Sequence, residues 1–210
     1  MYQIHPSEKL NGLFENKPYQ GAHPFEAKFL FLGLDANYAE NIENQNIFEQ
    51  IVEYHENGVK FWQKYGIHHP FLLPNYKGDG KRFHQNFAKI GFLPCHAAYI
   101  SFIELLHVPT VGRNRLISKD ILSKHIEFLR QAIFKGEAEY IFVTSTAYNL
   151  LKTVNGFEAL KKSFETVTSL RTLYQDEQRK IFQHLHFSNY GKFQQQMTLE
   201  AKSIFALTQE

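Results

Sequence analysis

Apolar residues along this chain form short runs that alternate with longer stretches of helical spacing. Short apolar or alternating runs are typical of strands, and they predict strands at 28–34, 98–106, 140–144, 168–174 and 180–186. Apolar residues three and four positions apart predict helices within 45–65, 79–90, 118–132, 147–153 and 194–207. This alternation predicts a layered α/β domain with a mainly parallel sheet.

The N-terminal segment differs in pattern from the rest of the chain. Residues 1–26 carry Pro6, Pro18 and Pro24 among polar residues, which predicts an irregular N-terminal lead-in. No linker-like segment follows it, and a chain of 210 residues suits one folded unit. We therefore expect a single domain over 1–210.

Composition narrows the class of protein. Hydrophobic residues make up 43% and aromatic residues 15% of the chain, which indicates a globular protein rather than a disordered one. Cys95 is the only cysteine, which excludes a disulfide framework and a four-cysteine metal site, so we expect a reducing, cytoplasmic location. No apolar run is long enough to span a membrane. A net charge of +2 neither indicates nor excludes nucleic-acid binding, because a local basic face is what matters.

Polar groups follow the first predicted strand directly. The run Phe-Leu-Phe-Leu at 29–32 ends at Gly33, and Asp35, Asn37 and Tyr38 come next. Glycine lets the backbone turn or approach a ligand closely. Open α/β sheets bind ligands at the carboxyl ends of their strands, so this segment predicts a site, although an ordinary solvated turn has the same composition.

A second polar segment follows the last predicted strand. His186, Ser188 and Asn189 stand there, and Gly191 closes the segment. Together with Asp35, His186 would give one pocket an acid and a base. The alternative is a hydrogen-bonded structural histidine.

Four strand ends in this order resemble the uracil-DNA glycosylase superfamily. They are residues 33–38 (Gly-Leu-Asp-Ala-Asn-Tyr), 99–106, 141–147 and 186–189 (His-Phe-Ser-Asn). The resemblance covers residues 27–195. It implies a three-layer αβα fold with a central, mainly parallel four-stranded sheet.

The resemblance also implies roles for single residues. Asp35 falls on the family's catalytic aspartate, which orients a water and faces positive charge on the sugar. His186 falls on the histidine that stabilises the departing base, and Ser188 on a serine that holds DNA phosphate. Departures from the family pattern are Ala36 and Phe187 where it has prolines, and Ser101 where the central strand often carries asparagine.

A base pocket needs an aromatic face and polar groups for the base edge. Phe48, thirteen positions after Asp35, suits the family's stacking phenylalanine, although a phenylalanine at helical spacing also suits the core. The expected base-binding residues are Gly33, Leu34, Asn37, Tyr38, Phe48 and Ser101.

Contacts to DNA phosphates need cations or hydroxyls around the pocket. Three sheet-end loops offer them, and each is equally compatible with an ordinary solvated loop. The expected DNA-binding residues are Lys81, Arg82, Arg113, Arg115, Ser188, Asn189, Tyr190 and Lys192. Tyr190 is the nearest bulky residue to serve as a base-step wedge.

Rival chemistries rest on weaker patterns. The chain has eleven histidines, and His184 and His186 would share a strand face, but no zinc-helix spacing is present. Ser145 and Cys95 lie outside any nucleophile-elbow pattern.

The sequence therefore predicts a monomeric DNA glycosylase that removes a damaged or deaminated base of the uracil type, with no metal and no cofactor. The alternative is a non-catalytic nucleic-acid or base-binding protein of the same fold.

Overall fold

A six-stranded sheet forms the centre of the computed structural model, which describes residues 2–112, 115–161 and 169–209. Its strands lie in the order β2-β4-β3-β6-β8-β7. The strand bounds are β2 (Tyr19–Gly21), β3 (Phe29–Gly33), β4 (Ile100–Glu104), β6 (Tyr140–Thr144), β7 (Arg171–Gln175) and β8 (Lys180–His184).

The four inner strands, β4, β3, β6 and β8, are mutually parallel, and the two edge strands are antiparallel to their neighbours. The expectation of a mainly parallel sheet is confirmed, but the expected count of four strands is wrong. β2 and β7 each add an antiparallel edge. β7 is the first strand of the expected hairpin with β8, and the expected start of that hairpin at residue 168 lies outside the described residues.

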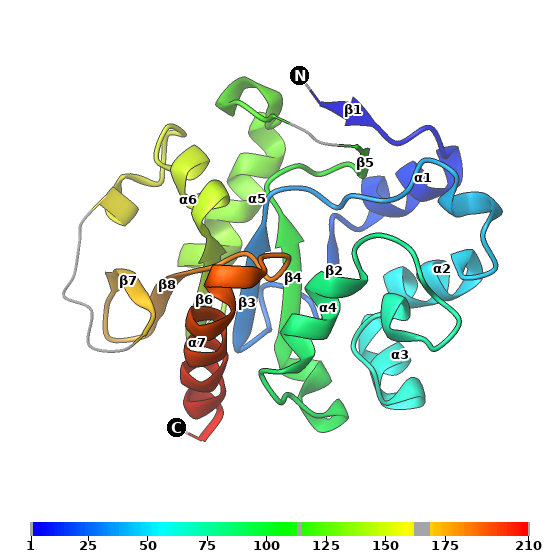
Figure 1. Cartoon of the computed structure of the whole chain (residues 1–210). Coiled ribbons are helices and arrows are strands. Elements are labelled where there is room, and N and C mark those ends of the chain that lie inside the picture. Colours follow the sequence, from blue (N-terminus) through cyan, green and yellow to red (C-terminus); the bar gives the residue numbers. More distant parts are fainter. Residues whose placement is uncertain (1, 113–114, 162–168, 210) are drawn as a thin grey trace.

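Burial on both faces explains the continuous apolar runs of the inner strands. Phe29 and Phe31 pack into one hydrophobic cluster, and Leu30 and Leu32 into another on the opposite face. The first cluster is covered by α3 (Gly58–Tyr65), α4 (Lys81–Ala88) and α7 (Gln194–Ala206), and the second by α5 (Ser123–Phe134) and α6 (Ser145–Leu151). Figure 1 shows α4 and α7 in front of the sheet and α5 behind it, which is a three-layer αβα arrangement.

The N-terminal segment is structured, so the expectation of an irregular lead-in over 1–26 is wrong. It contains β1 (Gln3–Ile4), which pairs with β5 (Thr110–Val111), then α1 (Glu8–Asn16) and the edge strand β2. The Ser7 hydroxyl caps α1 by accepting a hydrogen bond from the Leu10 amide at 3.1 Å. Pro6 and Pro18 lie between these elements and Pro24 follows β2, where a proline breaks no hydrogen-bonded ladder.

The expected helix at 45–65 is two helices, α2 (Phe48–Glu56) and α3, because Asn57 ends the first and caps the second. α1 and α2 pack on each other in a third hydrophobic cluster beside the sheet. The remaining helical turns are η1 (Ile42–Asn44), η2 (Pro70–Leu72), η3 (Pro94–Tyr99), η4 (Ser118–Asp120), η5 (Glu158–Lys161), η6 (Gly191–Phe193) and η7 (Leu207–Gln209). Within the described ranges, none of the helices combines the length and the apolar character that crossing a bilayer requires.

The strand order fixes where a ligand site is expected. The chain runs from β3 to its neighbour β4 on one side and later to β6 on the other side. Open α/β sheets bind ligands outside the carboxyl ends of the strands where the order reverses in this way.

Candidate functional site: a pocket with two carboxyl groups and aromatic walls

A cavity of about 610 Å³ lies at the carboxyl ends of the parallel strands. Its volume is within the range of small-molecule sites. Asp35 and His186, which are 151 positions apart in the sequence, both line it. Burial lowers the pKa of His186, and the two residues are close enough that the negative charge of Asp35 opposes this shift. The structure therefore brings the two candidate catalytic residues to one cavity.

The loop after β3 fixes the position of Asp35. This loop runs beside β5: Thr110 N donates to Ala36 O at 2.9 Å, and Tyr38 N donates to Thr110 O at 3.0 Å. The Thr110 hydroxyl donates to Asp35 Oδ2. The carboxylate is thus held by a buried hydroxyl on the neighbouring segment.

Asn37 supports this contact instead of facing a ligand with its amide hydrogens. Its Nδ2 donates to Thr110 Oγ1 at 3.0 Å and to Gly112 O at 2.7 Å, which uses both hydrogens. The Thr110 hydroxyl has one hydrogen, so accepting from Asn37 leaves that hydrogen for Asp35. Asn37 lines the cavity, and both of its amide hydrogens are used on protein oxygens, one of them on the hydroxyl that holds Asp35.

Gly33, Leu34 and Tyr38, which the sequence predicts as base-binding residues, also line the cavity. Tyr38 is buried, and its hydroxyl accepts a hydrogen bond from Gln20 Nε2 at 3.0 Å. Burial raises the pKa of Tyr38 well above its usual value, so the phenol is neutral. Tyr38 is a wall of the pocket rather than an acid or base.

Ser101 was expected to read the base, and this expectation is wrong. Ser101 is fully buried, does not line the cavity, and its hydroxyl has no hydrogen-bond partner among the described residues. Successive side chains of a strand point to opposite faces. Phe102 and Glu104 therefore face the cavity, and Ser101 faces away.

Glu104 is the functional candidate that sequence reasoning missed. It is the last residue of β4, directly in register with Gly33 of β3. Burial, and secondly the charge of Asp35, raise the pKa of Glu104 to about 8. The available signal was the acid that ends this mostly apolar strand. Because side chains alternate along a strand, this acid lies on the opposite face of the sheet from Ser101.

Phe48 was expected to stack on the base, and this expectation is also wrong. Phe48 is buried in the cluster of α1 and α2 and does not line the cavity. The aromatic walls come instead from other segments. They are formed by Phe31, Phe102, Tyr38, Tyr54, Phe71, Phe83, His69 and His84.

Two of these wall residues are a stacked histidine pair. The rings of His69 and His84 lie 3.5 Å apart, centroid to centroid, at an interplanar angle of 5°. Burial holds the pKa of both well below the usual value, so both rings are neutral. Phe71 and Phe83 contact this neutral pair edge to face, so this side of the cavity is lined by aromatic rings without charge.

His186 lies at the mouth of the cavity with one side exposed. Its Nδ1 accepts a hydrogen bond from the Ser188 amide at 3.2 Å, which places the ring proton of the neutral form on Nε2. Protein atoms around its other side lower the pKa of His186, and the charge of Asp35 opposes that shift. α4 holds this loop, because Asn86 Nδ2 donates to Phe187 O at 2.6 Å.

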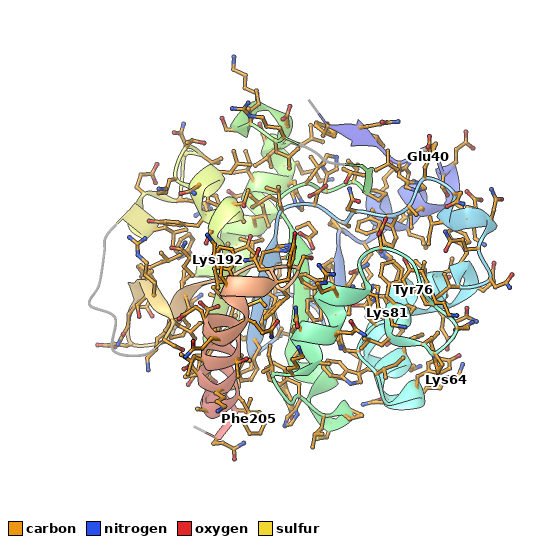
Figure 2. All side chains as sticks on the ribbon, viewed as in Figure 1. Glu40, Lys64, Tyr76, Lys81, Lys192 and Phe205 are labelled. Atoms are coloured by element: carbon orange, nitrogen blue, oxygen red, sulfur yellow. The ribbon has the colours of Figure 1, made fainter. Side chains whose placement is uncertain are left out.

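The expected DNA-binding residues lie at different places. Ser188 and Asn189 line the cavity mouth. The Arg82 guanidinium lies over the Tyr190 ring at 4.9 Å, and both line a second hollow of the surface, while Lys192 is exposed at η6. Lys81 holds its own loop, because its Nζ donates to Tyr76 O at 2.6 Å; Figure 2 shows these two residues side by side. Arg115 is exposed, and Arg113 lies outside the described residues.

The rival chemistries find little support in the described part of the chain. No group of three or more histidine, cysteine, aspartate or glutamate side chains there is arranged to hold a metal ion. The Ser145 hydroxyl accepts a hydrogen bond from Gln183 Nε2 at 2.8 Å, and Cys95 is exposed outside the cavity.

Comparison with known proteins gave no match, neither to a family model nor to a curated protein.

Proposed function

We propose that this protein hydrolyses the N-glycosidic bond of a damaged or deaminated base of the uracil type in DNA. The observation that carries the proposal is that Asp35 and His186 meet at one cavity with aromatic walls and a volume suited to a flipped-out base. The proposed fold relationship is to uracil-DNA glycosylases, and the proposed setting is a monomer acting on DNA in the cytoplasm.

The reaction separates charge, and the two side chains match that separation. As the bond between C1′ and the base nitrogen breaks, positive charge develops on the sugar and negative charge on the base. The Asp35 carboxylate stabilises the sugar cation and accepts a proton from the attacking water. His186 Nε2–H donates a hydrogen bond to an oxygen of the departing base. The water oxygen ends on C1′, and the proton taken by Asp35 passes to the base, so no metal or redox cofactor is needed.

The surface around the cavity mouth suits DNA. Arg82 and Tyr190 offer a cation and an exposed ring, and Lys192 adds a second cation. Exposed aromatic rings stack on bases without regard to sequence, and cations contact phosphates. This arrangement supports a polynucleotide substrate over a free nucleoside.

The test is a glycosylase assay on oligonucleotides, single- and double-stranded, that contain uracil, hypoxanthine, xanthine or mismatched thymine. Alkali cleaves the strand wherever an abasic site has formed. Asp35→Asn and His186→Ala should each lower the single-turnover rate by about two to three orders of magnitude, because each removes one charge-stabilising group. Glu40→Gln is the matched control, since Glu40 is exposed and lies outside the cavity lining; Figure 2 labels its position.

The second candidate is a non-catalytic protein that binds DNA or a base with the same pocket. The replacement of two family prolines by Ala36 and Phe187 favours it. Binding of modified DNA without any abasic product at high protein concentration would exclude the enzyme and support this reading. Full activity in both variants above would refute the assigned roles.

A further inference from the structure

Glu104 lines the cavity, and its carboxyl group is closely packed. It is the last residue of β4, and its register partner is Gly33 on β3. A Cβ atom at Gly33 would lie 2.0 Å from Glu104 Oε2 and 2.8 Å from Oε1. A side chain at position 33 would push the flexible end of Glu104 aside, so the carboxyl group in its present position packs directly against the glycine.

No cation of the described residues forms an ion pair with this carboxyl group. None of the ion pairs among the described residues involves Glu104, and its side chain makes no hydrogen bond with the described residues. The one histidine that bonds to Glu104 is His125 of α5, whose Nε2 donates to the backbone oxygen at 2.9 Å.

The ionisable groups around Glu104 come from every element that surrounds the cavity. They are Asp35 and Tyr38 after β3, Tyr54 of α2, His69 before η2, His84 of α4, His125 of α5, and His184 and His186 at the end of β8. The tyrosines and the buried histidines are neutral, and Asp35 brings negative charge. Burial without a cation therefore favours the protonated acid.

A protonated carboxyl group has one donor and one acceptor side by side, whereas a carboxylate has acceptors only. The –NH–CO– edge of an oxo-base such as uracil or hypoxanthine offers the complementary pair. We propose that Glu104 is the specificity-determining residue of the pocket, a neutral acid that donates its O–H to the base oxygen and accepts the adjacent N–H. This inference rests on the proposed function and deepens it by naming the edge that is read.

The proposal gives binding a defined pH dependence. The pKa of Glu104 is raised to about 8, so the neutral form is present below that pH and is lost above it. The ionised form repels the base oxygen. Affinity for an oxo-base should therefore be constant below pH 8 and fall about tenfold for each pH unit above it.

The test is titration calorimetry with free uracil from about pH 6 to about pH 9.5, a range that spans the expected transition. The second probe is 3-methyluracil, which lacks the N–H. Glu104→Gln keeps a donor and an acceptor but cannot ionise, so it should bind uracil at pH 7 within a fewfold of the native protein and show only the pH dependence of uracil itself. Glu104→Ala and 3-methyluracil should each lose about tenfold or more in affinity. Thermal unfolding of each variant verifies that it is folded.

The ionisation of Glu104 can also be measured without a ligand. The infrared difference spectrum between native protein and Glu104→Gln should contain the C=O band of a neutral carboxylic acid. That band should disappear as the pH rises through about 8. Absence of the band at pH 6 (roughly two units below the transition), or identical pH profiles of uracil binding in the two proteins, would overturn the proposal. Uracil binding with this profile but without any abasic product would overturn the glycosylase function alone, whereas catalysis with unchanged profiles would overturn only the role of Glu104.

Discussion

At the scale of single residues, the pocket depends on one small residue that makes room for a larger one. Gly33 does not have a positive φ, so it is not needed for a left-handed turn. The Glu104 carboxyl group lies where a side chain at this position would be, so a larger residue would push that group aside. In the spacing Gly-x-Asp at the end of β3, the glycine thus packs against the Glu104 carboxyl group and the aspartate lines the cavity.

Gly33→Ala should therefore displace Glu104 from the floor of the cavity. We expect a loss of about tenfold or more in uracil affinity, because a partner of the base edge moves away. Gly12→Ala is the control, since a Cβ there meets nothing within 4 Å and alanine favours the helix α1. Calorimetry measures both, and equal affinities in the two variants would contradict the packing argument.

At the scale of elements, the N-terminal segment contributes to the sheet and to the cavity wall. α1 packs on α2, β2 extends the sheet, and Gln20 of β2 bonds to Tyr38 in the cavity wall. The site consequently rests on residues that precede the first parallel strand.

Ser7→Ala should reveal this dependence in stability. It removes the side-chain cap of α1, and such a cap stabilises by about 1 kcal/mol. Urea unfolding followed by circular dichroism should show that loss in one cooperative transition. Glu15→Ala, an exposed change on the same helix, should have little effect. A native midpoint in Ser7→Ala would indicate that α1 adds nothing to the fold.

At the scale of the whole molecule, the cations that suit DNA are unevenly placed. Figure 2 shows Lys192 near the start of α7 and Lys64 on a distant part of the surface. Lys64 is paired with Glu53 at 2.6 Å, whereas Arg82 and Lys192 stand beside exposed aromatic rings.

Arg82→Ala and Lys192→Ala should each weaken DNA binding and reduce the slope of log affinity against log salt by about one. Lys64→Ala removes the same charge elsewhere and should leave that slope unchanged. Fluorescence anisotropy with a labelled oligonucleotide measures all three. A reduced slope in Lys64→Ala alone would place the DNA on the other surface.

The chain's own pattern was sufficient for the features that depend on neighbouring residues. Apolar runs located the parallel strands, helical spacing located most helices, and polar residues after two strand ends located Asp35 and His186 at what proved to be one cavity. These features follow from local chain direction, because a buried strand must end where polar residues begin.

The tertiary structure alone decided which side chains face the cavity. Ser101 and Phe48 point elsewhere, and Glu104, His69 and His84 take their places. Which side chains face the cavity depends on the register between strands and on the packing of segments far apart in the chain. The spacing of residues within one segment determines neither.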